Sequence, residues 1–150
     1  MYKYKSEQWL PIGIEEAWKF FSSPANLSLI TPPEMDFKIL STLENDIYEG
    51  MIIDYKIKPL LGIAMRWQTE ICKVEHEKYF TDRQQKGPYK VWEHTHTFIE
   101  NNGGVLMTDK IIYQLPFSFI GKLAHRLFVR NKIENIFNFR KNILNKIFIK

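Results

Sequence analysis

The chain has 150 residues, of which 45% are hydrophobic and 15% aromatic, and it carries a formal net charge of +4. This length normally forms one domain, so we expect a single domain spanning residues 1–150, and the apolar content excludes a disordered protein. The charge is modest and no nucleic-acid-binding motif accompanies it, so nucleic acid is not an expected partner. Cys72 has no second cysteine to pair with, and residues 1–10 lack the apolar run of a signal peptide. We therefore expect a soluble, cytoplasmic protein.

The first thirty residues predict one strand followed by two short helices. Side chains alternate in character from Tyr2 to Leu10, which favours a strand. Ile14–Phe21 has apolar residues at helical spacing, with two acids at its start that suit a helix N-terminus. Ser23 and Pro24 have the character of a cap and a first helical position, and they predict a second short helix through Leu29.

The middle of the chain predicts antiparallel strands. Asn45–Asp46, Gly87–Pro88 and 101–104 supply turn residues between extended runs. Short connections between consecutive strands are typical of an antiparallel meander, and we expect about seven strands in all. The expected runs are 37–43, 51–57, 64–75, the two arms of 79–98, and 105–115.

The end of the chain, Phe117–Ile149, predicts one long helix, because it has no proline and no glycine after Gly121. At about 1.5 Å per residue it would be roughly 45 Å long and would lie across the whole sheet. The complete prediction is an α+β fold. Apolar residues expected to face the sheet are Ile120, Leu123, Ala124, Leu127, Phe128, Ile136, Phe137, Ile143, Leu144 and Ile147. The expected basic face carries Lys122, Arg126, Arg130, Lys132, Arg140, Lys141, Lys146 and Lys150, with Glu134 as its acid.

Two motifs carry a family resemblance. The run F-T-D-R-Q-Q-K-G-P-Y-K-V-W-E-H-T-H-T-F, followed by M-T-D-K-I-I-Y-Q-L-P-F, resembles the START-like, or SRPBCC, superfamily. Within it, the motifs are similar to a bacterial stand-alone ligand-binding subgroup whose members are often labelled polyketide cyclases. The resemblance implies a helix-grip fold, in which an antiparallel sheet curls around a long C-terminal helix and leaves a cavity between them.

The implied cavity gives a role to alternate residues of one predicted strand. Trp92, His94, His96 and Phe98 share one face of that strand, since successive side chains point to opposite faces. We expect an apolar wall with a few polar groups, which would suit a hydrophobic molecule with one polar end, such as a lipid, polyketide or isoprenoid-like compound. The candidate ligand-binding residues are Trp67, Gln84, Trp92, His94, His96, Phe98, Met107, Asp109 and Tyr113.

His94 and His96 admit three interpretations. Their spacing on a strand occurs in some metal sites, with Asp109 as a conceivable third ligand. Alternatively, they form hydrogen bonds to a ligand, or they satisfy buried polarity within the core. Because the other candidate residues are poor metal ligands, we favour the hydrogen-bonding role and expect neither a metal nor another cofactor.

Three functions remain open from the sequence. We favour non-catalytic binding or carriage of a small hydrophobic molecule. The alternative is a cyclase- or dehydratase-like enzyme, in which His94 or His96 is the general base, Asp109 orients it and Tyr113 stabilises an enolate-like oxygen. The third is a protein-interaction module with an incidental pocket. The basic face of the last helix is either a solvated surface or a contact with an anionic membrane.

Overall fold

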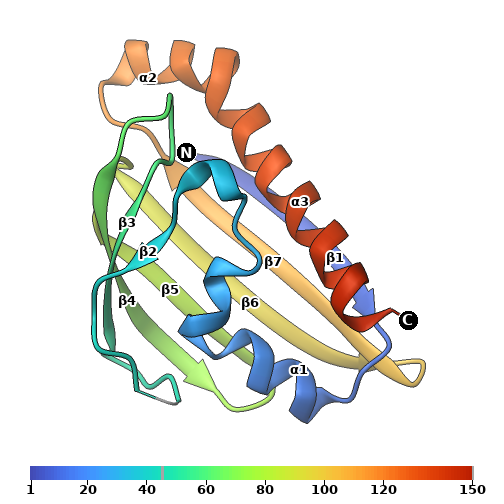
Figure 1. Ribbon diagram of the computed structural model, residues 1–150. Coiled ribbons are helices and arrows are strands. Elements are labelled where there is room, and N and C mark those ends of the chain that lie inside the picture. Colours follow the sequence, from blue (N-terminus) through green and yellow to red (C-terminus); the bar gives the residue numbers. More distant parts are fainter. Residues whose placement is uncertain (45, 150) are drawn as a thin grey trace.

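The computed structural model describes residues 1–44 and 46–149, and in this part of the chain one antiparallel sheet has the strand order β1-β7-β6-β5-β4-β3-β2. The sheet is curved, and the helices lie on its concave side (Figure 1). This arrangement confirms the α+β helix-grip fold. The strands are β1 (Tyr2–Leu10), β2 (Lys38–Ile39), β3 (Ile52–Ile57), β4 (Met65–Glu75), β5 (Tyr79–Lys86), β6 (Val91–Asn101) and β7 (Gly104–Gln114).

The helical residues fall into one long helix and several short segments. They comprise α1 (Ile14–Phe21), the 3₁₀ turns η1 (Pro24–Ser28) and η2 (Pro33–Met35), α2 (Ser118–Ala124), the π-helical turn η3 (His125–Val129) and α3 (Arg130–Phe148). No helix of the described residues is long and apolar enough to cross a membrane.

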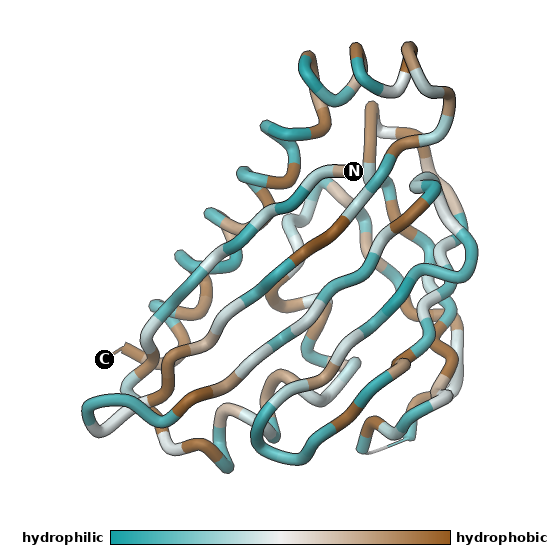
Figure 2. The backbone as a smooth tube through the Cα atoms, turned by 180° about the vertical axis from the view of Figure 1, so that it is seen from behind, coloured by the Kyte–Doolittle hydropathy of each residue, from teal (hydrophilic) through white to brown (hydrophobic). Residues whose placement is uncertain are grey.

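The long strands bury one face and leave the other to solvent. In β6, His94, His96 and Phe98 are buried on the concave side, while the threonines between them are only partly covered. Figure 2 views the sheet from its convex side, where hydrophilic and hydrophobic residues alternate along the strands. This two-residue period sets which side chains can reach the space beneath the helices.

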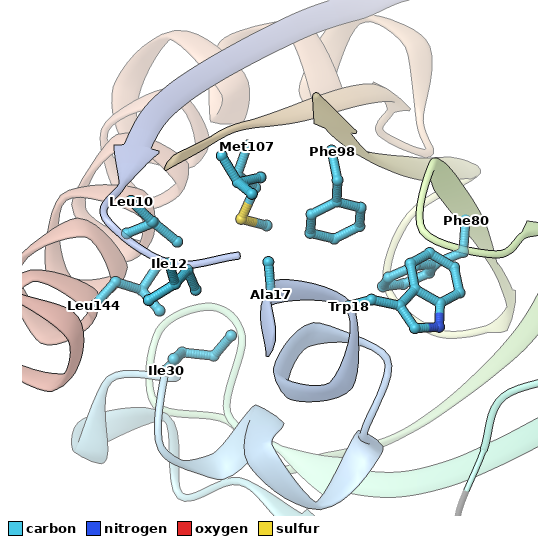
Figure 3. Packing of buried hydrophobic residues seen from close by; sticks show 10 residues of the cluster. Leu10, Ile12, Ala17, Trp18, Ile30, Phe80, Phe98, Met107 and Leu144 are labelled. Atoms are coloured by element: carbon cyan, nitrogen blue, oxygen red, sulfur yellow. The ribbon is translucent and has the colours of Figure 1, made fainter. Parts of the chain in front are cut away.

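Helix α1 closes one end of the concave face. Its buried residues, Ala17 and Trp18, pack over Phe98 and Met107 in an apolar cluster (Figure 3). The Trp18 and Phe98 rings meet edge to face, with their centroids 5.7 Å apart. The concave space that remains unfilled lies further along the strands.

Two predictions for the N-terminal half need correction. The second short helix is only the 3₁₀ turn at Pro24–Ser28, because its hydrogen bonds span three residues rather than four. The strand expected over 37–43 is reduced to Lys38–Ile39, because the next two amides, of Leu40 and Ser41, converge on a single acceptor, the carbonyl oxygen of Asp54. Asn45 and Lys150 lie outside the described residues, so the expected turn at 45–46 and the place of Lys150 stay predictions.

The long C-terminal helix begins before it reaches the sheet. Its α3 part crosses the concave face, whereas α2 projects beyond the ends of the strands (Figure 1). As a result, part of the expected apolar face is wrong, because Ile120, Leu123, Leu127 and Phe128 are exposed. Ile147, near the end of α3, is exposed as well. The expected basic face also needs one correction. Arg140 was expected on the solvent side of the helix, but it is buried between α3 and the sheet.

Candidate functional site

A cavity of about 150 Å³ lies between the sheet, α3 and the segment that runs from α1 to β2. Its lining is mostly apolar and it is partly open to solvent. Strands β3 and β4 supply Tyr55 and Trp67, and α3 supplies Ile133 and Phe137. Polar side chains meet on one part of this wall: Asp82 from β5, His94 and His96 from β6, and Arg140 from α3.

These polar groups form one buried network around Asp109 on β7. His94 Nε2 hydrogen-bonds Asp109 Oδ1 at 2.8 Å, and Arg140 Nη1 donates to the same oxygen at 3.4 Å. His96 Nε2 hydrogen-bonds Asp82 Oδ2 at 3.2 Å. At most 8% of His94, His96, Asp109 or Arg140 is exposed, so the charges of this network compensate one another with little help from water.

Strand register explains how the network assembles. Asp82 pairs with His94 across β5 and β6, and Asp109 pairs with His96 across β6 and β7. Arg140 follows Phe137 by three residues on α3, so both side chains face the sheet, and the guanidinium lies 4.8 Å from the centre of the Phe137 ring. The apolar side of α3 therefore carries one cation, which lies opposite the Asp109 carboxylate.

The network shifts the pKa of its members in different directions. Burial would raise the pKa of Asp109, but the Arg140 cation and the two imidazoles outweigh burial and hold it below its usual range. Burial, assisted by the neighbouring imidazole, lowers the pKa of His94. Burial also opposes charge on His96, yet Asp109 and Asp82 outweigh it and raise the pKa of that imidazole. Of the two histidines, His96 is the one that the carboxylates favour in its protonated form.

Asp82, His94 and His96 are also the residues that could hold a metal ion. One ligand atom from each lies within 4.8 Å of the others. However, His96 Nε2 already forms a hydrogen bond with Asp82, and the Arg140 cation lies 3.4 Å from Asp109 in the same network. A divalent ion would have to displace that hydrogen bond and work against the guanidinium charge, so the arrangement favours hydrogen bonding. The absence of a metal stays a prediction.

Three residues that line the cavity each have a buried nitrogen atom without a hydrogen-bond partner within the described residues: Trp67 Nε1, Arg140 Nε and His96 Nδ1. His96 Nδ1 lies 3.0 Å from Asp109 Oδ1 but without the alignment of a hydrogen bond. Buried polar groups are nearly always satisfied, so unpartnered nitrogens in such a place indicate room for an acceptor.

The structure separates the predicted site residues into two groups. Trp67, Trp92, His94 and His96 line the cavity. Phe98 and Met107 do not, because α1 covers them. Asp109 is absent from the lining and contacts three residues that belong to it, His94, His96 and Arg140.

Gln84 and Tyr113 also lie outside the cavity lining. Gln84 is engaged at its own hairpin, where its side-chain amide donates to the Tyr89 carbonyl and accepts from the Tyr89 N–H. Tyr113 places its hydroxyl 2.8 Å from His125 Nε2, so it is directed to the C-terminal helix. The polar atoms of Gln84 and Tyr113 therefore form hydrogen bonds within the protein, although the sequence predicted that both residues would face a ligand.

Sequence reasoning missed Asp82, Arg140 and the aromatic residues Tyr55 and Tyr89 of the lining. Asp82 was detectable, since it shares a strand face with the buried Phe80. Arg140 also left a signal, because it falls at helical spacing among buried apolar residues of α3. Such a position allows a basic side chain to meet a buried acid, which here is Asp109.

Comparison with known proteins identifies the fold. No protein-family model and no curated protein matches the sequence. Among solved structures, CV1439 from Chromobacterium violaceum is 14% identical with a TM-score of 0.71, covering 99% of this chain and 97% of its own. Ms6760 from Mycobacterium smegmatis is 16% identical with a TM-score of 0.67, covering 97% and 92%. The major latex-like protein 151 of Panax ginseng is 11% identical with a TM-score of 0.67, covering 99% and 97%. At these identities the likeness shows the helix-grip fold alone.

Proposed function

We propose that the protein binds and carries a small hydrophobic molecule that has one polar, hydrogen-bond-accepting end. This proposal rests on an apolar cavity lined by Trp67, His96 and Arg140, each of which has a buried nitrogen atom without a hydrogen-bond partner within the described residues. An apolar lining with a few placed polar groups is typical of sites for small molecules. The polar end of the ligand would accept hydrogen bonds from those nitrogens.

The cavity volume limits the size of the ligand. About 150 Å³ is comparable to an engineered apolar cavity that accommodates benzene. A molecule of single-ring size therefore fits without rearrangement, whereas a lipid, polyketide or isoprenoid-like compound would extend through the open side or displace the segment between α1 and β2. We accordingly favour the smaller class.

Native mass spectrometry of freshly purified protein tests for a co-purified ligand, and calorimetric titration tests the chemistry. We expect benzyl alcohol to bind more tightly than toluene, because only the alcohol oxygen can accept a hydrogen bond. Trp67→Phe keeps an aromatic ring but removes a donor, so it should weaken benzyl alcohol binding about fivefold and leave toluene unchanged. Trp9→Phe, at the exposed end of β1, is the matched control. The proposal fails if neither probe binds and no small molecule co-purifies.

One observation favours acid–base catalysis as a second candidate. The His94–Asp109 hydrogen bond, at 2.8 Å, adjoins the cavity in the manner of an oriented general base. The resemblance to proteins labelled polyketide cyclases points the same way, although Tyr113 is not placed to stabilise an oxyanion. Carriage predicts that His94→Gln weakens binding, whereas catalysis predicts retained binding with a large loss of turnover. A protein-interaction module would bind no small molecule, either as the unmodified protein or as His94→Gln.

A further inference from the structure

The segment 117–130 exposes an unusual amount of apolar surface. Large side chains that are at least half exposed are Phe117 (76%), Phe119 (78%), Ile120 (68%), Leu123 (51%), Leu127 (53%) and Phe128 (53%). Together they present on the order of 600 Å² of apolar surface, the upper range for a soluble monomer. We call these six residues the α2 surface. A surface of this size is commonly an interaction site.

The α2 surface is held in place by contacts on its inner side. His125 Nε2 lies 2.8 Å from the Tyr113 hydroxyl, and the His125 ring stacks on Tyr2 at 3.4 Å between centroids. Gly121 is buried so tightly that a Cβ atom there would clash with the Pro116 carbonyl oxygen. The π-helical turn η3 also turns Val129 into the core. The apolar side chains are therefore displayed outward by an anchored helix.

Charge identifies the kind of partner. The stretch 117–133 contains Lys122, Arg126, Arg130 and Lys132 but no aspartate or glutamate. Arg130 is paired with Glu134 and Lys132 lies 3.8 Å from Glu34, so the charge of this surface comes from Lys122 and Arg126. Lys122 and Arg126 are exposed among the apolar residues. A second copy of the chain would bring like charges together, whereas an anionic surface would neutralise them. Phenylalanine and leucine with interspersed basic residues are the composition of helices that lie in the membrane interface.

A second segment reaches the same end of the molecule. The turn between β3 and β4 exposes Leu61 (77%) and Ile63 (59%), and it extends toward the end where α2 projects (Figures 1 and 2). Pro59, at the base of this turn, lines the cavity. We propose that the α2 surface, together with the β3–β4 turn, docks this protein onto an anionic lipid bilayer. This inference does not depend on what the cavity binds.

Sedimentation with vesicles tests the proposal. We expect the protein to sediment with vesicles of equal parts phosphatidylglycerol and phosphatidylcholine, to bind pure phosphatidylcholine far less, and to release at high salt. Phe119→Ser/Leu127→Ser should weaken binding about tenfold or more, as should Lys122→Glu/Arg126→Glu. Circular dichroism melting establishes that each variant is folded.

Control variants make the same kinds of substitution elsewhere on the surface. Ile99→Ser alters an exposed apolar residue of β6, and Lys3→Glu/Lys110→Glu makes the same change in net charge on β1 and β7. Both controls should bind vesicles like the unmodified protein. The proposal is overturned if anionic vesicles are not bound, or if the controls lose as much affinity as the α2 variants. Light scattering that shows a dimer abolished by Phe119→Ser would also overturn it in favour of a second copy.

Discussion

Replacing Arg140 by methionine tests the buried network most directly. The change removes the cation that lies 3.4 Å from Asp109 and leaves that carboxylate 5% exposed with only imidazoles to compensate it. Breaking a buried ion pair by removing one partner costs about 3–5 kcal/mol. For a chain of this length each kcal/mol corresponds to a fall in Tm of roughly 2–4 °C, so we expect a loss of about 10 °C.

Urea denaturation and calorimetry measure this loss, and two further variants make the interpretation specific. Lys146→Met removes a cation from the exposed side of α3 and should change the free energy of unfolding by less than about 0.5 kcal/mol. Asp109→Leu/Arg140→Met removes both charges and should recover at least half of the lost stability, as replacement of buried pairs by apolar residues often does. A change of less than about 1 kcal/mol for Arg140→Met would show that the buried guanidinium does not stabilise Asp109.

Three other changes test separate features. The pKa of Asp109 is held below its ordinary 3.8 because the neighbouring guanidinium and imidazoles outweigh burial, so its stabilisation is complete above that value and is lost as the pH falls toward the folded pKa. The free energy of unfolding, measured by urea denaturation between pH 5 and about 2, should therefore depend less on pH in Asp109→Asn than in the unmodified protein. Leu144→Ala, at a core position 1% exposed, should cost about 2–5 kcal/mol in urea denaturation. Gly121→Ala should cost about 1–3 kcal/mol through its clash with a backbone carbonyl, whereas Gly13→Ala, with nothing within 4 Å, should cost less than about 1 kcal/mol.

Periodicity explains which parts of the cavity were predictable. The two-residue repeat of β6 correctly grouped Trp92, His94 and His96 on the concave face, because that face depends only on local backbone geometry. The same repeat could not show that Phe98 is covered, since the covering residue, Trp18, comes from a helix whose position along the strand depends on tertiary packing.

Burial of a charged residue was harder to foresee. Arg140 has the helical spacing of a core residue, yet a basic side chain is exposed in most proteins, and only its approach to Asp109 reverses that expectation. The α2 surface shows the converse error. Leu123 and Leu127 have the spacing of a buried face, but this part of the helix lies beyond the ends of the strands and is exposed. Helical periodicity cannot show how far the sheet extends beneath the helix.

The strand order has a consequence for how the chain folds. β2 to β7 pair in the order in which they are synthesised, but β1 pairs with β7, and Tyr2 lies opposite Tyr113. The first strand therefore remains unpaired until β7, the last strand of the sheet, has been synthesised. Contacts of such long sequence separation slow folding and leave strand edges open to other chains. Lys3 and Lys5, on the outward face of β1, place charge on this unpaired strand and disfavour its pairing with a strand of another chain.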